Sequence, residues 1–250
     1  MSILPDALWL NVSPSLRRFD RPLLHYLSQQ MMIAQWEYSQ TQDEACSLEI
    51  ALVLLHDYLK SCDRPIHLIG HSMSGLLGLL YARRYPKRVR SLTLLSVGIH
   101  PAIDWQAFYY AHRQLLPCSR QMILARMVDN LFGDQFHPIA QGLLRTLERD
   151  LETSLSPHTL FRRESIAPGG AAAPLFVCSG EDDMIVSPHE LQGWQSWLKK
   201  GDRLWKCPQG RYFFHYFQPK QVGQQIVDFY ASLLPETTEQ TTLEPLGASS

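Results

Sequence analysis

The sequence lacks the features that mark several specialised classes of protein. Its cysteines are few and widely spaced, and no C-x-x-C pair occurs among them: Cys46, Cys62, Cys118, Cys178 and Cys207. This pattern indicates neither a disulfide framework nor a zinc site, so we expect reduced thiols. No apolar run reaches the length of a transmembrane helix. No basic stretch precedes a long apolar run near Met1, so we expect no signal peptide.

Excess charge and cofactor motifs are also missing. The chain has 23 lysines and arginines against 24 aspartates and glutamates, which gives a formal net charge of −1. A balance this even gives no reason to expect binding to nucleic acid or to an acidic membrane surface. No phosphate loop, metal motif or dinucleotide fingerprint is present, so no cofactor is implied. We therefore expect a cytoplasmic protein with a small-molecule partner, and its oligomeric state stays open.

What the sequence does contain is an alternation of strand-like and helix-like segments. At 250 residues, of which 45% are hydrophobic, one α/β domain is the natural expectation. Strands are predicted at residues 7–12, 31–36, 66–69, 89–97, 175–178 and 203–207. This order predicts an α/β fold with an open, mostly parallel sheet of about six strands and helices on both faces.

The alternation is interrupted once, and the interruption divides the chain. Residues 99–167 contain short aromatic-rich patterns of helical spacing and no convincing strand. We expect them to form a helical cap inserted between a first core segment (1–98) and a second one (168–234). The polar tail, 235–250, has no periodicity and is expected to be disordered.

The chain is organised around the stretch from Pro65 to Val97, which reads as strand, sharp turn, helix and strand. The turn places Ser72 at a helix N-terminus, where free N–H groups stabilise developing negative charge. The segment Gly70-His71-Ser72-Met73-Ser74-Gly75 resembles the nucleophile elbow of the α/β-hydrolase superfamily, usually G-x-S-x-G, with Ser74 in the last position. The alternative interpretation is a serine that merely caps the helix.

The resemblance covers about residues 4–234, and within the superfamily the chain is most similar to lid-bearing serine esterases and lipases. It implies an α/β-hydrolase fold with a shortened N-terminal edge and Ser72 as the nucleophile. It also implies an acid in the loop after the strand 175–178, which resembles G-x-x-D-x-x-V-x-P and points to Asp183. The neighbouring Asp182 is the competing choice.

The resemblance implies a base between the last strand and the last helix. His215 lies there, as the histidine of the family's G-x-H loop does, although Phe213 and Phe214 replace the usual small residues. The alternative interpretation is a histidine packed in an aromatic cluster. With Ser72 and Asp183, His215 would complete a Ser-His-Asp triad that hydrolyses esters through an acyl-enzyme.

The oxyanion hole is the least regular part of the pattern. One donor is expected to be the backbone N–H of Met73. The second should come from the loop after the first strand, where the family has His-Gly and this chain has Asn11-Val12. Val12 is β-branched and does not easily adopt positive φ. The N–H of Val12 or Ser13, or the side-chain amide of Asn11, could serve instead.

Four further residues are candidates for the substrate pocket. They are Asn11, His71 beneath the elbow, His100 after a sheet strand, and Phe214 near the base. The predicted function is a cofactor-free serine hydrolase that cleaves carboxylic esters of a hydrophobic small molecule. The alternatives are a thioesterase or acyltransferase with the same triad, or a non-catalytic binding protein whose oxyanion hole has degenerated.

Overall fold

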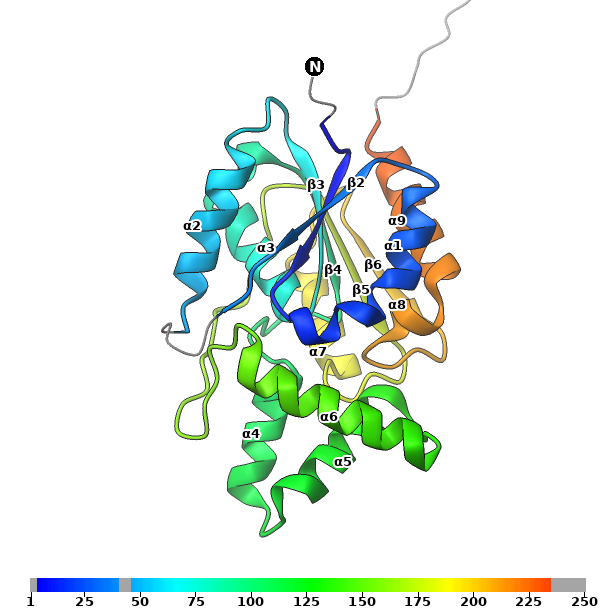
Figure 1. Ribbon diagram of the computed structural model, residues 1–250. Helices are drawn as coiled ribbons and strands as arrows, with labels where there is room; N and C mark the ends of the chain where they lie inside the picture. Colours follow the sequence, from blue (N-terminus) through cyan, green and yellow to red (C-terminus); the bar gives the residue numbers. More distant parts are fainter. Residues whose placement is uncertain (1–3, 41–45, 235–250) are drawn as a thin grey trace, which may run out of the picture.

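The computed structural model describes residues 4–40 and 46–234 (Figure 1). The strands are β1 (Ala7–Asn11), β2 (Ile33–Glu37), β3 (Ile66–His71), β4 (Val89–Leu95), β5 (Leu175–Gly180) and β6 (Arg203–Cys207). The α-helices are α1 (Arg21–Ser28), α2 (Leu48–Leu59), α3 (Met73–Arg84), α4 (Trp105–Leu115), α5 (Arg120–Phe132), α6 (His137–Thr153), α7 (Pro188–Gln192), α8 (Phe214–Phe217) and α9 (Pro219–Ser232). Short 3₁₀ helices are η1 (Pro14–Phe19), η2 (Pro86–Arg88) and η3 (Gly193–Ser196). The tail expected to be disordered lies outside the described residues.

The strands form one six-stranded sheet in the order β2-β1-β3-β4-β5-β6. Every neighbouring pair of strands is parallel. The structure thus confirms the predicted fold, an α/β-hydrolase sheet with a shortened N-terminal edge. Parallel strands need helical crossovers, which explains why helices cover both faces of the sheet.

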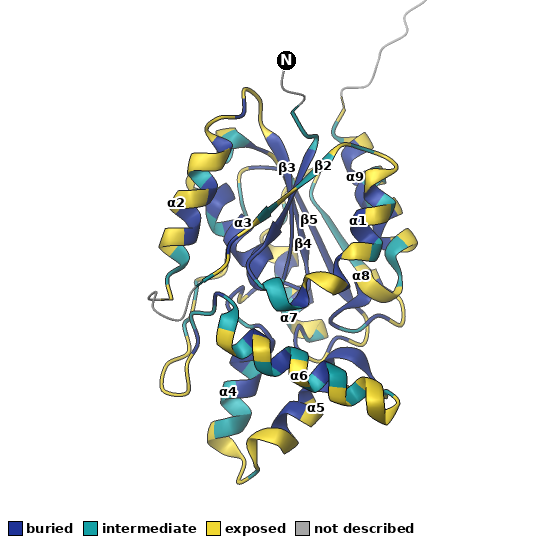
Figure 2. Cartoon of the chain, in the orientation of Figure 1, coloured by how far each residue is buried: buried dark blue, intermediate teal, exposed yellow. Residues whose placement is uncertain are grey.

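Alternation along β1 shows how the two faces are built. Leu8 and Leu10 pack on α2 and α3, and Ala7 and Trp9 pack on α1 and α9. Successive side chains of a strand point to opposite faces, so a strand buried on both faces reads as a continuous apolar run. Figure 2 shows the result: the central strands are buried, while the edge strand β2 and the outer sides of the helices are more exposed. Among the described residues, no helix is long and apolar enough to cross a bilayer.

Helices α4, α5 and α6 gather at the carboxyl ends of the strands (Figure 1). They pack on one another through a third apolar cluster, which also takes in Leu16 and Phe19 of η1. Three short helices, η1, η2 and α8, were not predicted from the sequence. Between β5 and β6 the chain forms a short α7 followed by η3.

The turn between β3 and α3 requires very close approach of two backbone segments. A Cβ atom added at Gly70 would lie 2.6 Å from the carbonyl oxygen of Ser74 and 2.6 Å from the nitrogen of Gly75. Both neighbours are backbone atoms, so no side-chain movement can relieve the contact.

We therefore expect Gly70→Ala to lower the free energy of unfolding by about 2–3 kcal/mol, because added bulk forces a packed backbone to shift. The measurement is urea denaturation followed by circular dichroism. Gly142→Ala on α6 is the control, since a Cβ there meets nothing within 4 Å. It should raise stability by up to about 1 kcal/mol. Equal stability of the two variants would contradict the packing argument.

Candidate functional site

Ser72 occupies a strained turn between β3 and α3. Its φ of 55° and ψ of −125° lie in a region that residues other than glycine rarely adopt. Its N–H donates to the carbonyl of Leu95 at 2.8 Å, and its own carbonyl accepts from the N–H of Leu76 at 2.9 Å. Such a conformation costs on the order of 1–3 kcal/mol and persists only where neighbouring structure imposes it. The local geometry is that of a nucleophile elbow.

The partner of the Ser72 hydroxyl is a tyrosine. Tyr212, fully buried in the loop between β6 and α8, donates its phenolic O–H to Ser72 Oγ. The carbonyl of Tyr212 accepts from His71 Nε2 at 2.9 Å and lies 2.9 Å from Ser96 Oγ. Burial raises the pKa of Tyr212 well above its ordinary value. The phenol therefore stays neutral and cannot remove the proton of Ser72.

His215 is not joined to the other two members of the expected triad. Its Nε2 lies 3.1 Å from Oδ1 of Asp20, and its Nδ1 has no hydrogen-bond partner among the described residues. No hydrogen bond links it to Ser72 or Asp183 in the part of the chain that the structure describes. Burial lowers the pKa of His215 to about 3, so the ring is neutral. The expected role as base is therefore not supported by this geometry, because the ring packs inward beside Asp20.

Asp183 lies where the family resemblance places the acid, but its carboxylate oxygens accept hydrogen bonds from groups other than a histidine. Oδ1 accepts from the N–H groups of Ile185 and Val186 at 2.8 and 2.9 Å. Oδ2 accepts from the hydroxyl of Ser96 at 2.9 Å and from that of Ser179 at 3.2 Å. Burial raises the pKa of Asp183 to about 6, although these hydrogen bonds oppose the shift.

The competing acid, Asp182, is exposed on the same loop, whereas Asp183 is buried. The geometry therefore favours Asp183 as the acid position. It orients its own loop and Ser96, however, and not an imidazole.

Two of the three expected backbone oxyanion donors already donate hydrogen bonds to other groups. The N–H of Val12 donates to Ser74 Oγ at 3.0 Å, and the N–H of Ser13 donates to Asn11 Oδ1 at 2.9 Å. The side-chain amide of Asn11 donates to Glu37 at 3.3 Å. Met73 begins α3, and its N–H is one of the amides that a helix N-terminus leaves without intrahelical partners. Only this one of the three expected backbone donors is thus left for an oxyanion.

Of the remaining pocket candidates, the structure brings only His71 and Asn11 to Ser72. Both line the same small cavity as the serine. His100 is half-exposed and contacts Glu190, with 2.9 Å between Nδ1 and Oε1. Phe214 is fully buried in the cluster beneath α9. Neither His100 nor Phe214 lines this cavity, because each belongs to a different packing layer.

The cavity at Ser72 is very small. Its volume is about 20 Å³, and its walls include Leu16 and Asp20 from the segment that carries η1. A volume of this size holds about one water molecule.

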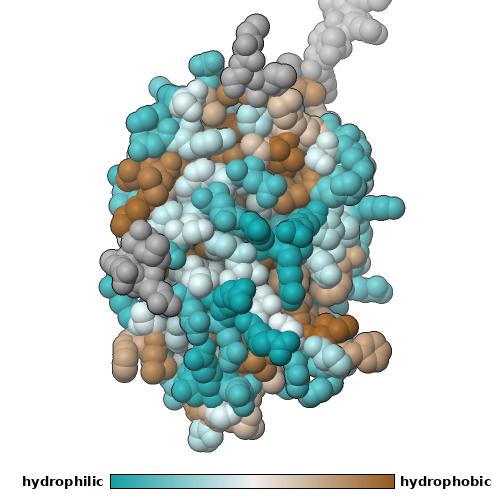
Figure 3. Space-filling view, viewed as in Figure 1, coloured by the Kyte–Doolittle hydropathy of each residue, from teal (hydrophilic) through white to brown (hydrophobic). Residues whose placement is uncertain are grey.

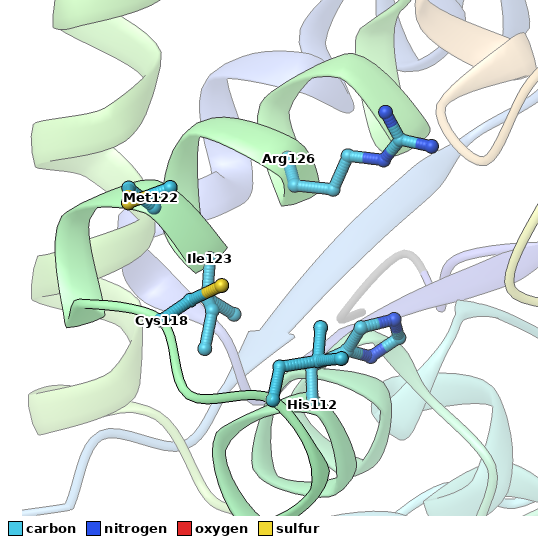
Figure 4. A pocket seen from close by; sticks show the side chains of 6 residues that line it. His112, Cys118, Met122, Ile123 and Arg126 are labelled. Carbon is cyan, nitrogen blue, oxygen red and sulfur yellow. The ribbon is translucent and has the colours of Figure 1, made fainter.

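A larger cavity of about 420 Å³ lies between α4 and α5, lined by residues such as His112 and Arg126 (Figure 4). None of its lining residues belongs to the sheet edge that carries Ser72.

The sequence held a signal for Tyr212 that our prediction did not use. Counting the G-x-H pattern from Gly210 places its third residue at 212, which is tyrosine. His215 lies three positions further on. The contact between His215 and Asp20 joins residues 195 positions apart, and no local pattern announces it.

Comparisons with known proteins agree with this architecture. A family model described as alpha/beta hydrolase fold matches residues 60–153. The uncharacterized protein sll0249 of Synechocystis sp. (strain PCC 6803) is 47% identical over 94% of this chain and 94% of its own length. The uncharacterized protein alr2406 of Nostoc sp. (strain PCC 7120) is also 47% identical, over 90% of each chain.

Solved structures with the same fold include enzymes. Naproxen esterase (carboxylesterase NP) from Bacillus subtilis superposes with a TM-score of 0.68 and 18% sequence identity. The match covers 92% of this chain and 85% of the esterase. At this level of identity, the likeness establishes the fold alone.

The buried Asp20 gives the site a testable pH dependence. Burial raises its pKa to about 7, while His71 and a hydrogen bond from Trp9 oppose the shift. An aspartate in the unfolded chain ionises near pH 3.9. The protonated Asp20 therefore stabilises the fold fully below about pH 4, and this contribution is lost as pH rises towards 7.

Asp20→Asn cannot ionise but keeps an oxygen for Trp9. We expect its free energy of unfolding, relative to the wild type, to increase by about 2 kcal/mol between pH 5 and pH 7.5. Urea denaturation at the two pH values measures the change. A difference that stays constant, or that shrinks with rising pH, would show that Asp20 is not the buried acid described.

Proposed function

Because the chain belongs to the α/β-hydrolase superfamily, we propose that it uses this fold to bind a ligand, and that Ser72 does not hydrolyse esters. The observation that carries the proposal is the hydrogen bond from the Tyr212 hydroxyl to Ser72 Oγ. A serine hydroxyl becomes a nucleophile only when a neighbouring base takes its proton. A buried neutral phenol with a raised pKa does not perform that step.

Two further observations support the proposal. Each missing oxyanion donor costs about 3–4 kcal/mol of transition-state stabilisation, and the amides of Val12 and Ser13 are bound to Ser74 and Asn11. The cavity at Ser72, about 20 Å³, leaves no room for an ester. This function corresponds to the non-catalytic alternative raised by the sequence.

A serine hydrolase that acts on small esters is the second candidate. The strained backbone of Ser72 and the buried Asp183 at the acid position favour it. Activity would require Tyr212 to leave the serine and an imidazole, from His71 or His215, to replace it. The esterase, thioesterase and acyltransferase predictions therefore stay predictions.

Labelling with a fluorophosphonate probe distinguishes the two candidates. We expect the wild type to label no faster than twice the rate of Ser72→Ala, because the hydroxyl is not activated. Tyr212→Phe frees the hydroxyl without supplying a base, so it should stay equally slow. An active serine esterase in the same buffer controls for the probe.

Tyr212→His is the complementary variant, since it sets an imidazole beside Ser72. We expect it to label at least tenfold faster than the wild type. Wild-type labelling a hundredfold faster than that of Ser72→Ala would overturn the binding proposal and select the hydrolase.

A further inference from the structure

A basic hollow lies outside the Ser72 site, on the outer side of η1. Its volume is about 590 Å³, within the range of small-molecule pockets. It is formed by the segment from Pro14 to Arg21, the residues after β2, and the second half of α6. Four arginines line it, and no acidic residue does so among those that the structure describes: Arg17, Arg18, Arg21 and Arg149.

The arginines are largely without acidic partners. Arg17 makes one long ion pair with Glu37, at 3.6 Å, and both side chains are exposed. Within the described ranges, no ion pair engages Arg18, Arg21 or Arg149. Guanidinium groups stay protonated and match the geometry of phosphate and carboxylate oxygens. Four of them around one hollow therefore make it favourable for an anion.

An apolar groove continues from this hollow. Arg18 lines both, and the groove runs from there between η1, α6 and α8 with a volume of about 350 Å³. Its walls are mainly apolar or aromatic: Phe19, Phe132, Ile139, Leu143, Tyr216 and Phe217. Ile139 and Phe217 are each about half exposed, at 51% and 48%. Figure 3 shows strongly hydrophilic residues across the middle of this face and a hydrophobic patch beside them.

The arginines stand on a well-anchored segment. The inner side of η1 buries Leu16 and Phe19 in the core. The hydroxyl of Ser15 lies 2.9 Å from that of Thr153, which ties η1 to α6. The guanidinium of Arg18 lies 4.7 Å from the ring centre of Phe19, within cation–π distance. A site built on fixed elements loses less conformational entropy on binding.

We propose that these two adjoining hollows bind one amphipathic anion, with its phosphate head among the four arginines and its apolar chain in the groove. The concave shape of both parts fits a single soluble molecule better than a membrane surface. The site lies on the opposite side of η1 from Ser72. It therefore names a place and a ligand class that the proposed function leaves open, and it does not depend on whether Ser72 is reactive.

Isothermal titration calorimetry with dodecyl phosphate, below its critical micelle concentration, tests the proposal. Inorganic phosphate supplies the head alone, and dodecyl maltoside supplies the chain without charge. We expect one equivalent of dodecyl phosphate to bind at least tenfold more tightly than either. If it binds no more tightly than one of them, the combined site does not exist.

Variants locate the bound molecule. Arg149→Gln and Arg18→Gln should each weaken dodecyl phosphate at least tenfold, because each removes a guanidinium from the hollow. Arg145→Gln is the matched control, since Arg145 is exposed on the same helix but does not line the hollow. Phe217→Ser should weaken dodecyl phosphate but leave inorganic phosphate unchanged. Circular dichroism confirms that each variant is folded.

Two results would overturn the proposal. Equal weakening by Arg145→Gln and Arg149→Gln would indicate unspecific attraction to a basic surface. Binding to phosphatidylglycerol vesicles, with no binding of monomeric dodecyl phosphate, would identify a membrane contact instead.

Discussion

The hydrogen bond between the hydroxyls of Tyr212 and Ser72 is the interaction on which the site depends. In this bond Ser72 Oγ, the atom through which an elbow serine would react, accepts a hydrogen bond from Tyr212. Tyr212 is itself fixed by its carbonyl, which accepts from His71 and lies beside Ser96. The hydroxyl of Ser96 also donates a hydrogen bond to Asp183. One connected network of hydrogen bonds thus engages the serine and acid positions, which in a hydrolase would be available to the histidine and the substrate.

The segment that carries η1 separates the cavity at Ser72 from the basic hollow. Leu16 and Asp20 face inward and wall the cavity at Ser72. Arg17, Arg18 and Arg21 face outward and line the basic hollow. A single short segment therefore contributes walls to both the cavity and the hollow. Under the two proposals above, this division lets the fold keep a strained elbow serine while a ligand binds on the outer side of η1.

The sheet and the elbow could be predicted from sequence because their signals are local. Apolar runs mark the buried strands, and small residues mark the turn at Gly70. The register of the loop after β5 also singled out Asp183, and its role as the acid of a triad stays a prediction. The residue beside Ser72 did not follow, since two positions in one loop compete for that place and side-chain packing decides between them. His215 turns inward to Asp20, which no pattern near either residue reveals, and Tyr212 takes the place beside Ser72.

The short helices show the same limit. α8 spans only Phe214–Phe217, and η1 spans only Pro14–Phe19, so both are too short for a periodic pattern to be recognised. Both are held by contacts with distant parts of the chain, such as the bond between Ser15 and Thr153. Tertiary packing, and not local propensity, sets them in place.

A double-mutant cycle between Ser72→Ala and Tyr212→Phe tests the central interaction most directly. Each variant removes one hydroxyl, so the cycle isolates the energy of the bond between them. We predict a coupling free energy of about 1 kcal/mol in urea denaturation, typical of a buried hydrogen bond. Effects that add to within about 0.3 kcal/mol would mean that the two hydroxyls do not interact, and the account of an occupied serine would be wrong.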